Sequence, residues 1–466
     1  MEIKQRKAMS VVMLPHLAHG HVSPFFELAK RLSDRGFQIY FCSTPICLEP
    51  IRNNHLDDHH NKHSSSNIQL IDLQLPSSFH QDLPPHYHCT KNIPPHLMTT
   101  LLAALDATKP AFSDILKKLR PDLVVYDLFE PWAAEAAREL NIDAVLFLTN
   151  IASQNVRIET PKETEMSKEY IEYTIKNTVN GITPTQRFNR SVTGSSHMIL
   201  VKTSREIQAK YYKDGKQPHL AILRPLVHVG PLVQKPQDHH DGDEKLMDWL
   251  SKKEAASVVY VSIGSENFLS EEEMEEMAKG LELSNVDFIW VVRFHGGSNV
   301  ASIHEALPQS FLERINGRGL IVDWAPQAKV LAHASTGGFV SHCGWNSTLE
   351  SMMYGVPIIA IPIQLDQPLN AKLVVEMGVG VEVPRHDKKL VREEVANMVR
   401  RVMIEEEGNE VRKRAKELSV RLNEAEDEEF DEAVMKLVHL VQEPRNISAV
   451  ASKETRKLHE MYHNKS

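Results

Sequence analysis

The sequence predicts an α/β protein of two domains, each built on a parallel sheet, and three observations lead to this prediction. The chain has 466 residues, more than a single hydrophobic core usually serves. Strand-like and helix-like segments alternate along it, which is the pattern of parallel strands joined by helices. The alternation stops at the polar stretch LVQKPQDHHDGDEK and then starts again. We therefore expect a first domain over 1–231, a linker over 232–247, a second domain over 248–442 and a polar, basic C-terminal tail over 443–466.

The first domain is expected to open with a buried strand and an amphipathic helix. SVVMLP (10–15) is the strand, and the segment 22–36 places Leu28 and Leu32 on one helical face and ends at Gly36, a suitable C-cap. The same unit then recurs. Further strands are expected at 37–44, 121–128 and 142–149, with a helix starting near Pro131. Residues 151–197 are mixed and polar and predict no definite element.

The second domain repeats the alternation of strands and helices. The helix over 270–284 starts with Ser270 and Glu273, which have the spacing of a capping box. Helices that start near Arg392 and Glu407 close the domain. The expected strands are 257–265, 288–293, 319–324, 338–343 and 356–363.

Composition narrows the classes of function. The formal net charge is −9 and no basic stripe is present, which argues against binding to nucleic acid or to an anionic membrane. The four cysteines show no metal-ligand spacing and predict a reduced, cytoplasmic protein with free thiols. The histidine-rich runs at 55–67 and 237–243 are flanked by polar residues, and we interpret them as solvated loops.

No segment has the pattern of a membrane span or a signal sequence. The N-terminal apolar run ends at Pro15, which is too short for a signal sequence. No other segment reaches the roughly 18 uninterrupted apolar residues of a spanning helix. We expect no membrane span, and we expect a monomer.

One stretch gives the clearest indication of a binding site. It covers residues 324–367 and has the sequence WAPQAKVLAHASTGGFVSHCGWNSTLESMMYGVPIIAIPIQLDQ. In it a buried strand ends in a small-residue turn, and a helix starts near Asn346. The unpaired N–H groups and the dipole at such a helix start form an anion site. Around it stand the aromatic Trp324 and the polar residues His342, Asn346, Ser347, Glu350, Asp366 and Gln367. An aromatic face, a diphosphate cradle and hydroxyl-binding side chains together predict a nucleotide-sugar pocket.

This stretch resembles the C-terminal signature of plant-type UDP-dependent glycosyltransferases. The resemblance covers roughly residues 8–441. It implies the GT-B architecture, in which two Rossmann-like parallel-sheet domains face each other across a cleft. It also implies UDP-glucose as the donor substrate, because the final Gln367 resembles that of glucose users.

The resemblance further implies a role for each residue of the donor site. Trp324 stacks on uracil, Ala325 contacts the base through its backbone, and Gln327 and Glu350 hold the ribose. The diphosphate contacts are Ser265, His342, Asn346 and Ser347, and the sugar contacts are Trp345, Asp366 and Gln367.

The catalytic residues are expected at the carboxyl edge of the first sheet, where open α/β sheets place their ligands. In the resembling family the histidine of a GHxxP pattern is the general base, and here that pattern gives His21. Asp127 ends the strand PDLVVYD and matches the partner aspartate. A carboxylate on one ring nitrogen fixes the histidine tautomer. We interpret His16 and His19 as loop or acceptor-pocket residues.

The implied reaction is a single in-line displacement with inversion. The acceptor hydroxyl loses its proton to His21 while it attacks the anomeric carbon, and UDP leaves toward the helix N-terminus and His342. No DxD-like motif sits at a strand end in the second half of the sequence. We therefore predict no metal and no other cofactor.

A departure from the family pattern points to a subgroup. Many related chains carry a Trp in a WPLxxEQ-like run, whereas this chain has IPIQLDQPLN. With GHVSPFFELAKRL, this version resembles enzymes that add a sugar to the sugar of terpenoid, flavonoid or apocarotenoid glycosides. The acceptor pocket is expected in loops around 44–100 and 150–195.

Three alternatives stay open at this point. They are an aglycone-directed transferase, a nucleotide-sugar epimerase or phosphorylase, and a non-catalytic nucleotide-sugar binder. The sequence alone gives neither the acceptor nor the linkage position.

Overall fold

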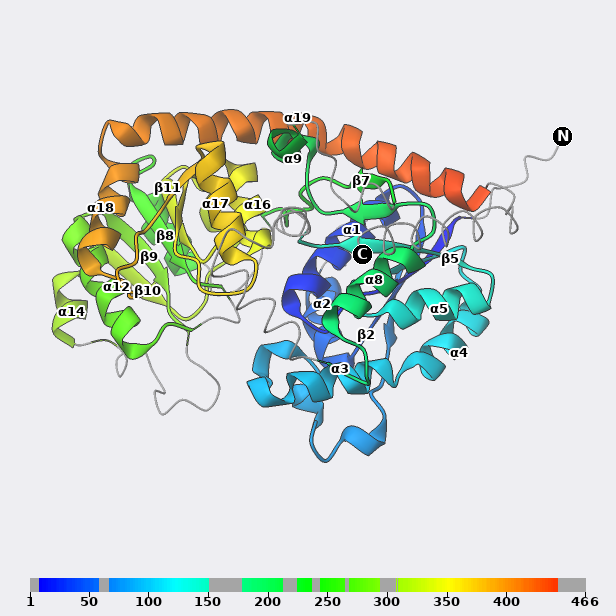
Figure 1. Cartoon of the computed structure of the whole chain (residues 1–466). Coiled ribbons are helices and arrows are strands. Elements are labelled where there is room, and N and C mark those ends of the chain that lie inside the picture. Colours follow the sequence, from blue (N-terminus) through cyan, green and yellow to red (C-terminus); the bar gives the residue numbers. More distant parts are fainter. Residues whose placement is uncertain are drawn as a thin grey trace, which may run out of the picture.

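A computed structural model describes residues 8–57, 67–150, 178–212, 224–236, 244–264, 268–293, 307 and 309–442. Two parallel sheets stand side by side, each covered by helices (Figure 1). The first has the strand order β3-β2-β1-β4-β5-β6-β7 and the second the order β10-β9-β8-β11-β12-β13. The predicted fold class is confirmed.

The first sheet is made of short strands whose central members are buried. Its strands are β1 (Ser10–Leu14), β2 (Gln38–Ser43), β3 (Ile68–Asp72), β4 (Leu123–Tyr126), β5 (Asp143–Leu148), β6 (Ile199–Val201) and β7 (Leu226–His228). The helices of this half are α1 (His19–Asp34), α2 (Pro45–Asp57), α3 (Met98–Asp106), α4 (Lys109–Leu119), α5 (Pro131–Glu139), α8 (Pro184–Gly194) and α9 (Arg205–Tyr212).

The second sheet begins after α11 (Glu244–Ser251). Its strands are β8 (Val258–Ser262), β9 (Asp287–Val291), β10 (Gly319–Val322), β11 (Thr336–Ser341), β12 (Ile358–Ala360) and β13 (Gly380–Glu382). Its helices are α12 (Glu271–Ser284), α14 (Gln309–Arg314), α15 (Gln327–Ala332), α16 (Trp345–Tyr354), α17 (Gln367–Met377), α18 (Arg392–Met403) and α19 (Glu407–Gln442).

Each sheet has a point where the strand order reverses, and both points position the site. In the first sheet β1 lies between β2 and β4, and in the second β8 lies between β9 and β11. The connections leave the sheet in opposite directions at such a point, which opens a crevice beyond the carboxyl ends of the strands. The residues that follow β1 and β4 therefore meet at one edge, and so do those that follow β8 and β11.

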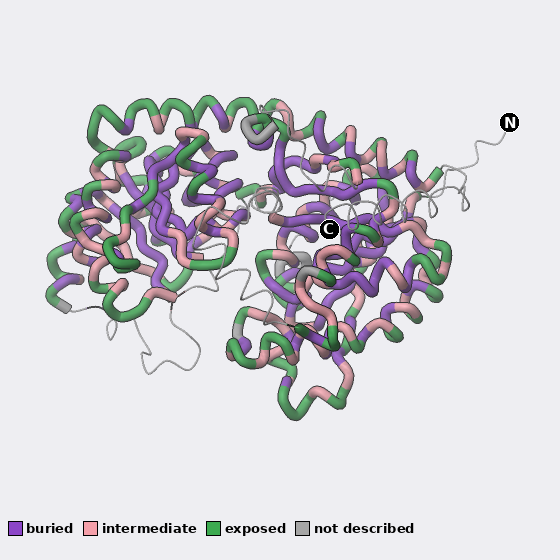
Figure 2. Tube along the Cα trace, viewed as in Figure 1, coloured by how far each residue is buried: buried purple, intermediate pink, exposed green. Residues whose placement is uncertain are grey.

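The two halves have separate apolar cores, and one helix belongs to both. Figure 2 shows the buried residues concentrated in the two sheets. Helix α19 runs along both halves (Figure 1). Its Leu418 and Leu422 pack with the core beside α16, whereas Phe430 and Leu437 pack in the core of the first sheet. The ring of Phe430 lies under the Arg31 guanidinium, 4.3 Å from its centroid.

Local signals explain most element boundaries. The capping box at Ser270 and Glu273 is formed, with the Glu273 N–H donating to Ser270 Oγ at 3.2 Å. Gly36 follows α1 with a φ of +86°, a conformation that favours glycine. Helix α1 begins at His19, three residues earlier than predicted, because the His21 and Val22 N–H groups already donate to the Ala18 carbonyl.

Some expectations were wrong or lie outside the described residues. The loop predicted over 55–67 is wrong at 55–57, where α2 continues to Asp57. Within the unassigned stretch 151–197, the described part contains α8, which starts with a capping box between Thr183 and Gln186. The run 237–243 and the tail 443–466 lie outside the described residues. None of the helices in the described ranges is long and apolar enough to cross a membrane.

Candidate active site

The two predicted catalytic residues meet at the edge of the first sheet. Strands β1 and β4 pair in register, with Leu14 opposite Tyr126. The residues that follow them therefore emerge together, and His21 Nδ1 lies 2.9 Å from Asp127 Oδ2. Thr149, which follows β5, brings its hydroxyl to 3.3 Å from the same ring nitrogen.

Asp127 is held as an anion that orients His21. Burial acts to raise the pKa of Asp127, but the charge and hydrogen bond of His21 bring it below its ordinary value. The Leu128 N–H donates to Oδ1 at 2.7 Å and the His16 N–H to Oδ2 at 3.3 Å. An ionised Asp127 accepts a hydrogen bond from the Nδ1–H group of His21, so Nε2 is the ring nitrogen that can accept a proton. Asp127 is not the N-cap of α5, which is Glu130.

A second histidine and carboxylate lie beside this pair, and sequence reasoning did not identify their contact. His16 Nδ1 is 2.8 Å from Glu130 Oε1, and the Glu130 side chain is fully buried. His16 follows β1 and Glu130 follows β4, as His21 and Asp127 do, so their position at the same sheet edge was the signal that could have found them.

On the second half, α16 presents its N-terminus at the carboxyl edge of the sheet. Its N-cap is Gly344, which has no side chain to occupy the first N–H groups. His342 precedes it and is buried, and burial lowers the pKa of His342 to about 4. His342 is therefore neutral near pH 7 and can only donate or accept a hydrogen bond at a diphosphate. We expected His342 to help hold the charge of departing UDP; as a neutral ring it can do so only through a hydrogen bond and not through a positive charge.

Two glycines leave room for the His342 ring. A Cβ atom on Gly264 would lie 2.6 Å from His342 Nε2, and one on Gly344 would lie 2.4 Å from it. Both distances are shorter than real contacts of this kind. His342 Nδ1 is buried and has no hydrogen-bond partner within the described ranges. The cradle is thus shaped around this imidazole.

Two of the residues expected at the uridine, Gln327 and Glu350, are in contact. Trp324 is 48% exposed, so an aromatic face is available at the surface. The Gln327 side-chain amide donates to Ser347 Oγ at 3.0 Å and also bonds Glu350 Oε2. Burial raises the pKa of Glu350. Ala325, the residue after Trp324, is buried, and Ser265, expected at the diphosphate, lies outside the described residues.

The first turn of α16 touches the first half of the chain. The Trp345 ring is 4% exposed, and its indole N–H donates to the carbonyl of Lys202 at 2.8 Å. Asn346 accepts a hydrogen bond from Lys202 Nζ at 2.6 Å and donates one to the Gly20 carbonyl at 3.1 Å. Sequence reasoning missed Lys202, a buried lysine whose pKa is lowered by burial to about 8. The buried Trp345 ring serves as packing between the halves, so its sugar contact stays a prediction.

The last two predicted donor residues stand at the start of α17. The Gln367 side-chain oxygen accepts hydrogen bonds from the Ile363 and Gln364 N–H groups, at 2.9 and 3.0 Å. Asp366 Oδ2 accepts one from Asn370 at 3.1 Å. These bonds fix the loop that follows β12, and they bring Asp366 and Gln367 to the edge that also carries His342.

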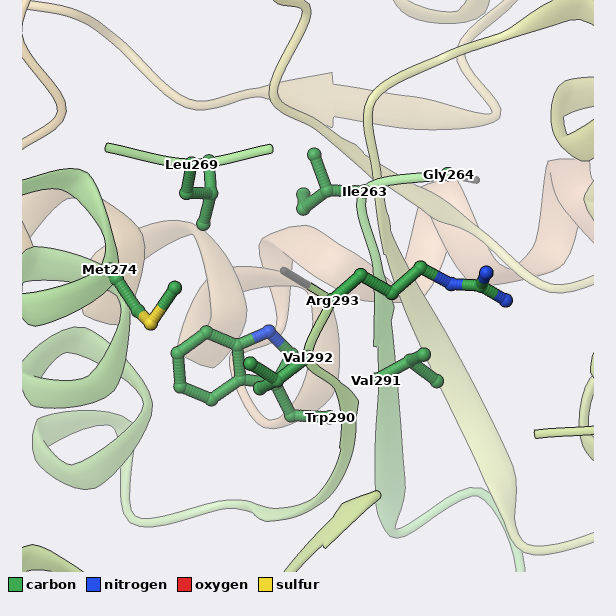
Figure 3. Close-up of a pocket in the computed structure, with 8 residues that line it drawn as sticks. All are labelled: Ile263, Gly264, Leu269, Met274, Trp290, Val291, Val292 and Arg293. Carbon is green, nitrogen blue, oxygen red and sulfur yellow. The ribbon is translucent and has the colours of Figure 1, made fainter. Parts of the chain in front are cut away.

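A small hollow at the carboxyl ends of β8 and β9 is not the donor pocket. Its volume is about 20 Å³, room for roughly one water molecule. It is lined by Ile263, Gly264, Leu269, Met274, Trp290, Val291, Val292 and Arg293 (Figure 3). The Trp290 ring points toward Met274, and the Arg293 side chain extends away from both (Figure 3). The described residues also contain no group of three metal-binding side chains.

Comparison with known proteins identifies the family. Residues 197–437 match the family described as UDP-glucoronosyl and UDP-glucosyl transferase, and residues 7–234 match the glycosyltransferase N-terminal domain. The flavanone 7-O-glucoside 2''-O-beta-L-rhamnosyltransferase of Citrus maxima is 45% identical over 95% of this chain and 99% of its own. The beta-D-glucosyl crocetin beta-1,6-glucosyltransferase of Gardenia jasminoides is 44% identical over 92% and 99%.

A solved structure agrees with these matches. UGT2 of Phytolacca americana, complexed with UDP-2fluoro-glucose and pterostilbene, aligns with a TM-score of 0.71 and 25% identity over 94% of this chain and all of its own. These matches do not support the binder, epimerase and phosphorylase alternatives. The chain therefore belongs to the plant UDP-dependent glycosyltransferases and is a glycosyltransferase enzyme.

Proposed function

We propose that this enzyme transfers glucose from UDP-glucose to a sugar hydroxyl of a small-molecule plant glycoside and forms a β-linked disaccharide. One observation carries the proposal. Asn346, in the first turn of the expected diphosphate cradle, donates its hydrogen bond to the carbonyl of Gly20, the residue before His21. A base and an anion cradle that lie this close can serve the two ends of one displacement.

The geometry supports the following sequence of events. The acceptor hydroxyl donates a hydrogen bond to His21 Nε2 and transfers its proton there as its oxygen attacks the anomeric carbon. The bond from that carbon to the UDP oxygen breaks, and the departing diphosphate is stabilised by the N–H groups of α16 and by neutral His342. Asp127 stabilises the imidazolium that forms at His21. Attack opposite to the leaving group inverts the α-linked donor to a β-glycoside.

Different observations support the proposed acceptor and the proposed donor. Both curated relatives are named for reactions on molecules that already carry a sugar, which supports extension of a glycoside. Their names differ in the transferred sugar, rhamnose in one and glucose in the other. Glucose is supported here by Gln367 at the end of the donor stretch and by the glucosyltransferase relative.

Product analysis by mass spectrometry tests the proposal. Purified enzyme is given UDP-glucose, UDP-rhamnose or UDP-glucuronic acid, with flavonoid and triterpenoid aglycones each paired with its monoglucoside. We expect the mass of one hexose to be added to the monoglucosides from UDP-glucose, with or without EDTA. Addition to bare aglycones would favour the aglycone-directed alternative, and transfer from another donor would contradict the assignment of glucose.

A further inference from the structure

The pair formed by His16 and Glu130 has no role in the reaction described above. It lies next to the catalytic pair, since the ring centroids of His16 and His21 are 5.5 Å apart and the rings are nearly perpendicular, at 78°. The His16 side chain keeps 12% of its surface exposed and that of His21 keeps 18%, whereas both carboxylates are buried. Two neighbouring histidines, each bonded to a buried carboxylate, therefore keep part of their surface accessible.

The surrounding contacts hold the second pair in place. Phe129 packs against His16 with ring centroids 4.5 Å apart. The Phe129 carbonyl accepts a hydrogen bond from Arg187 at 2.7 Å, and Arg187 is itself paired with Asp106. The Glu130 N–H donates to the Asp127 carbonyl at 3.3 Å. The loop that carries Glu130 is thus fixed from two sides.

The surroundings of the two carboxyl groups favour opposite protonation states. Burial and then the charge of Asp127 raise the pKa of Glu130 well above its ordinary value. Glu130 Oε2 is also buried and, among the described residues, has no hydrogen-bond partner. An ionised carboxylate would leave that charge uncompensated, whereas a neutral acid avoids the cost.

Opposite protonation states give the two histidines opposite polarity. A neutral Glu130 donates its O–H to His16 Nδ1, which places the His16 proton on Nε2. An ionised Asp127 accepts from His21 Nδ1, which leaves His21 Nε2 as the acceptor. One ring therefore offers an N–H donor and its neighbour offers a proton acceptor.

We propose that His16 binds the acceptor, donating a hydrogen bond from Nε2 to the hydroxyl on the carbon next to the one that His21 deprotonates. Two hydrogen bonds of about 2.8 Å can reach a pair of adjacent hydroxyls from rings at this separation. The acceptor is then a vicinal diol, and the new bond forms at a secondary ring hydroxyl. The primary hydroxyl of a hexose is excluded, because the carbon next to it carries the ring oxygen. This inference rests on the proposed transfer to a sugar.

The test compares a flavonoid β-D-glucoside with its monodeoxy analogues. Loss of the attacked hydroxyl abolishes transfer. Loss of its neighbour should leave transfer about tenfold slower in kcat/KM, the effect of one lost hydrogen bond. His16→Phe should lower kcat/KM about tenfold on the complete glucoside and have no further effect on the slower analogue. The KM for UDP-glucose should not change, and NMR of the product should show linkage at a secondary hydroxyl.

Variants of Glu130, the partner of His16, distinguish the effect of its hydrogen bond to His16 from the effect of its packing. Glu130→Gln keeps a donor toward His16 Nδ1 and should retain near wild-type activity, whereas Glu130→Leu should behave like His16→Phe. His386→Phe is the matched control, because it removes a histidine–glutamate contact of 3.0 Å at an exposed site in the second half. It should leave every rate unchanged.

Several outcomes would overturn the inference. They are an equal loss for His16→Phe on both acceptors, no loss on either, or linkage at the primary hydroxyl. These results leave the proposed transfer to glycosides intact. A wild-type enzyme that extends no glucoside would instead contradict the proposed function and, with it, this inference.

Discussion

At the scale of single residues, the site is a set of buried polar groups whose charge states are fixed by their partners. His21 lowers the pKa of Asp127 and favours its ionised form, burial and Asp127 raise the pKa of Glu130 and favour its neutral form, and burial alone favours the neutral form of His342. The chemistry depends on these states as much as on residue type. Single substitutions can therefore test each state separately.

His21→Ala should remove transfer without removing donor binding. A positioned general base typically contributes a factor of about 10² to 10⁴ to the rate. The expected donor contacts all lie on the other half of the molecule, so we expect kcat to fall by that factor and the Kd for UDP, measured by calorimetry, to stay within about twofold. If UDP binding were lost together with transfer, the assignment of His21 as the general base would be contradicted.

His342 should make the folded state sensitive to acid. The pKa of His342 is about 4 in the folded protein, against 6.5 for an ordinary histidine. Between these values the unfolded chain holds more protons, so stability falls as pH falls from 6.5 toward 4. At pH 5 this costs about 2 kcal/mol.

Urea unfolding at pH 7.5 and pH 5 measures this cost. The loss of unfolding free energy between the two values should be about 2 kcal/mol smaller in His342→Asn than in the wild type. Histidines with other environments, such as His228, contribute equally to both proteins and cancel. Equal losses would show that His342 is not buried as a neutral ring.

At the scale of secondary-structure elements, most of the fold follows from sequence pattern. Apolar runs such as 10–14 and 123–126 become buried central strands, and the Ser270 capping box marks the start of α12. Four strands were missed: β3, which is only partly buried, and β6, β7 and β13, which have three residues each. None of them gives a clear periodicity.

The positions of the catalytic residues could be predicted from the sequence as well as the strands could, but some of the contacts around them could not. Asp127 directly follows β4, and His21 lies in the first turn of α1, which follows β1, so the order of the elements fixes their edge of the sheet. The contacts of Glu130 with His16, and of Lys202 with Asn346, could not be predicted. They depend on how loops fold back on a sheet and on how the two halves meet.

The start of α16 offers a prediction at the scale of an element. Gly344 has a φ of −59°, which any residue can adopt, so only the nearby His342 ring opposes a side chain there. Gly344→Ala should displace that ring and weaken UDP binding about tenfold or more, as seen by calorimetry. In a His342→Ala background the same change should cost little, because the ring that it displaces is gone. Additive losses would mean that the glycine is needed for another reason.

At the scale of the whole molecule, the reaction requires that the two halves hold a fixed relation. The base stands on the first half and the expected donor cradle on the second, and the Asn346–Gly20 hydrogen bond joins them. Helix α19 strengthens the relation, because Leu418 and Leu422 pack in one core and Phe430 in the other. Arg31 adds ion pairs to Glu426 and Asp427 of the same helix, at 2.7 and 2.6 Å.

A substitution in the part of α19 that packs on the first half should therefore affect catalysis more than donor binding. Phe430→Ala removes a fully buried ring and should lower the unfolding free energy by about 3–5 kcal/mol. A displacement of about 1 Å between reacting groups can cost roughly 10²-fold in rate. We expect kcat to fall toward that extent at temperatures where circular dichroism shows folded protein. The Kd for UDP should change little, because the expected contacts lie on one half.

Met435→Ala is the matched control for this experiment. Met435 lies on the same helix but is 65% exposed, so its removal should change stability by no more than about 0.5 kcal/mol and leave kcat unaltered. If Phe430→Ala lowers stability but not kcat, the halves keep their relation without this ring, and the remaining contacts between them, such as Asn346 with Gly20 and Trp345 with Lys202, are sufficient. If UDP binding falls in parallel with kcat, the donor cradle itself depends on the first half. The loss in kcat relative to the loss in UDP affinity therefore measures how much α19 contributes to the alignment of the base with the donor.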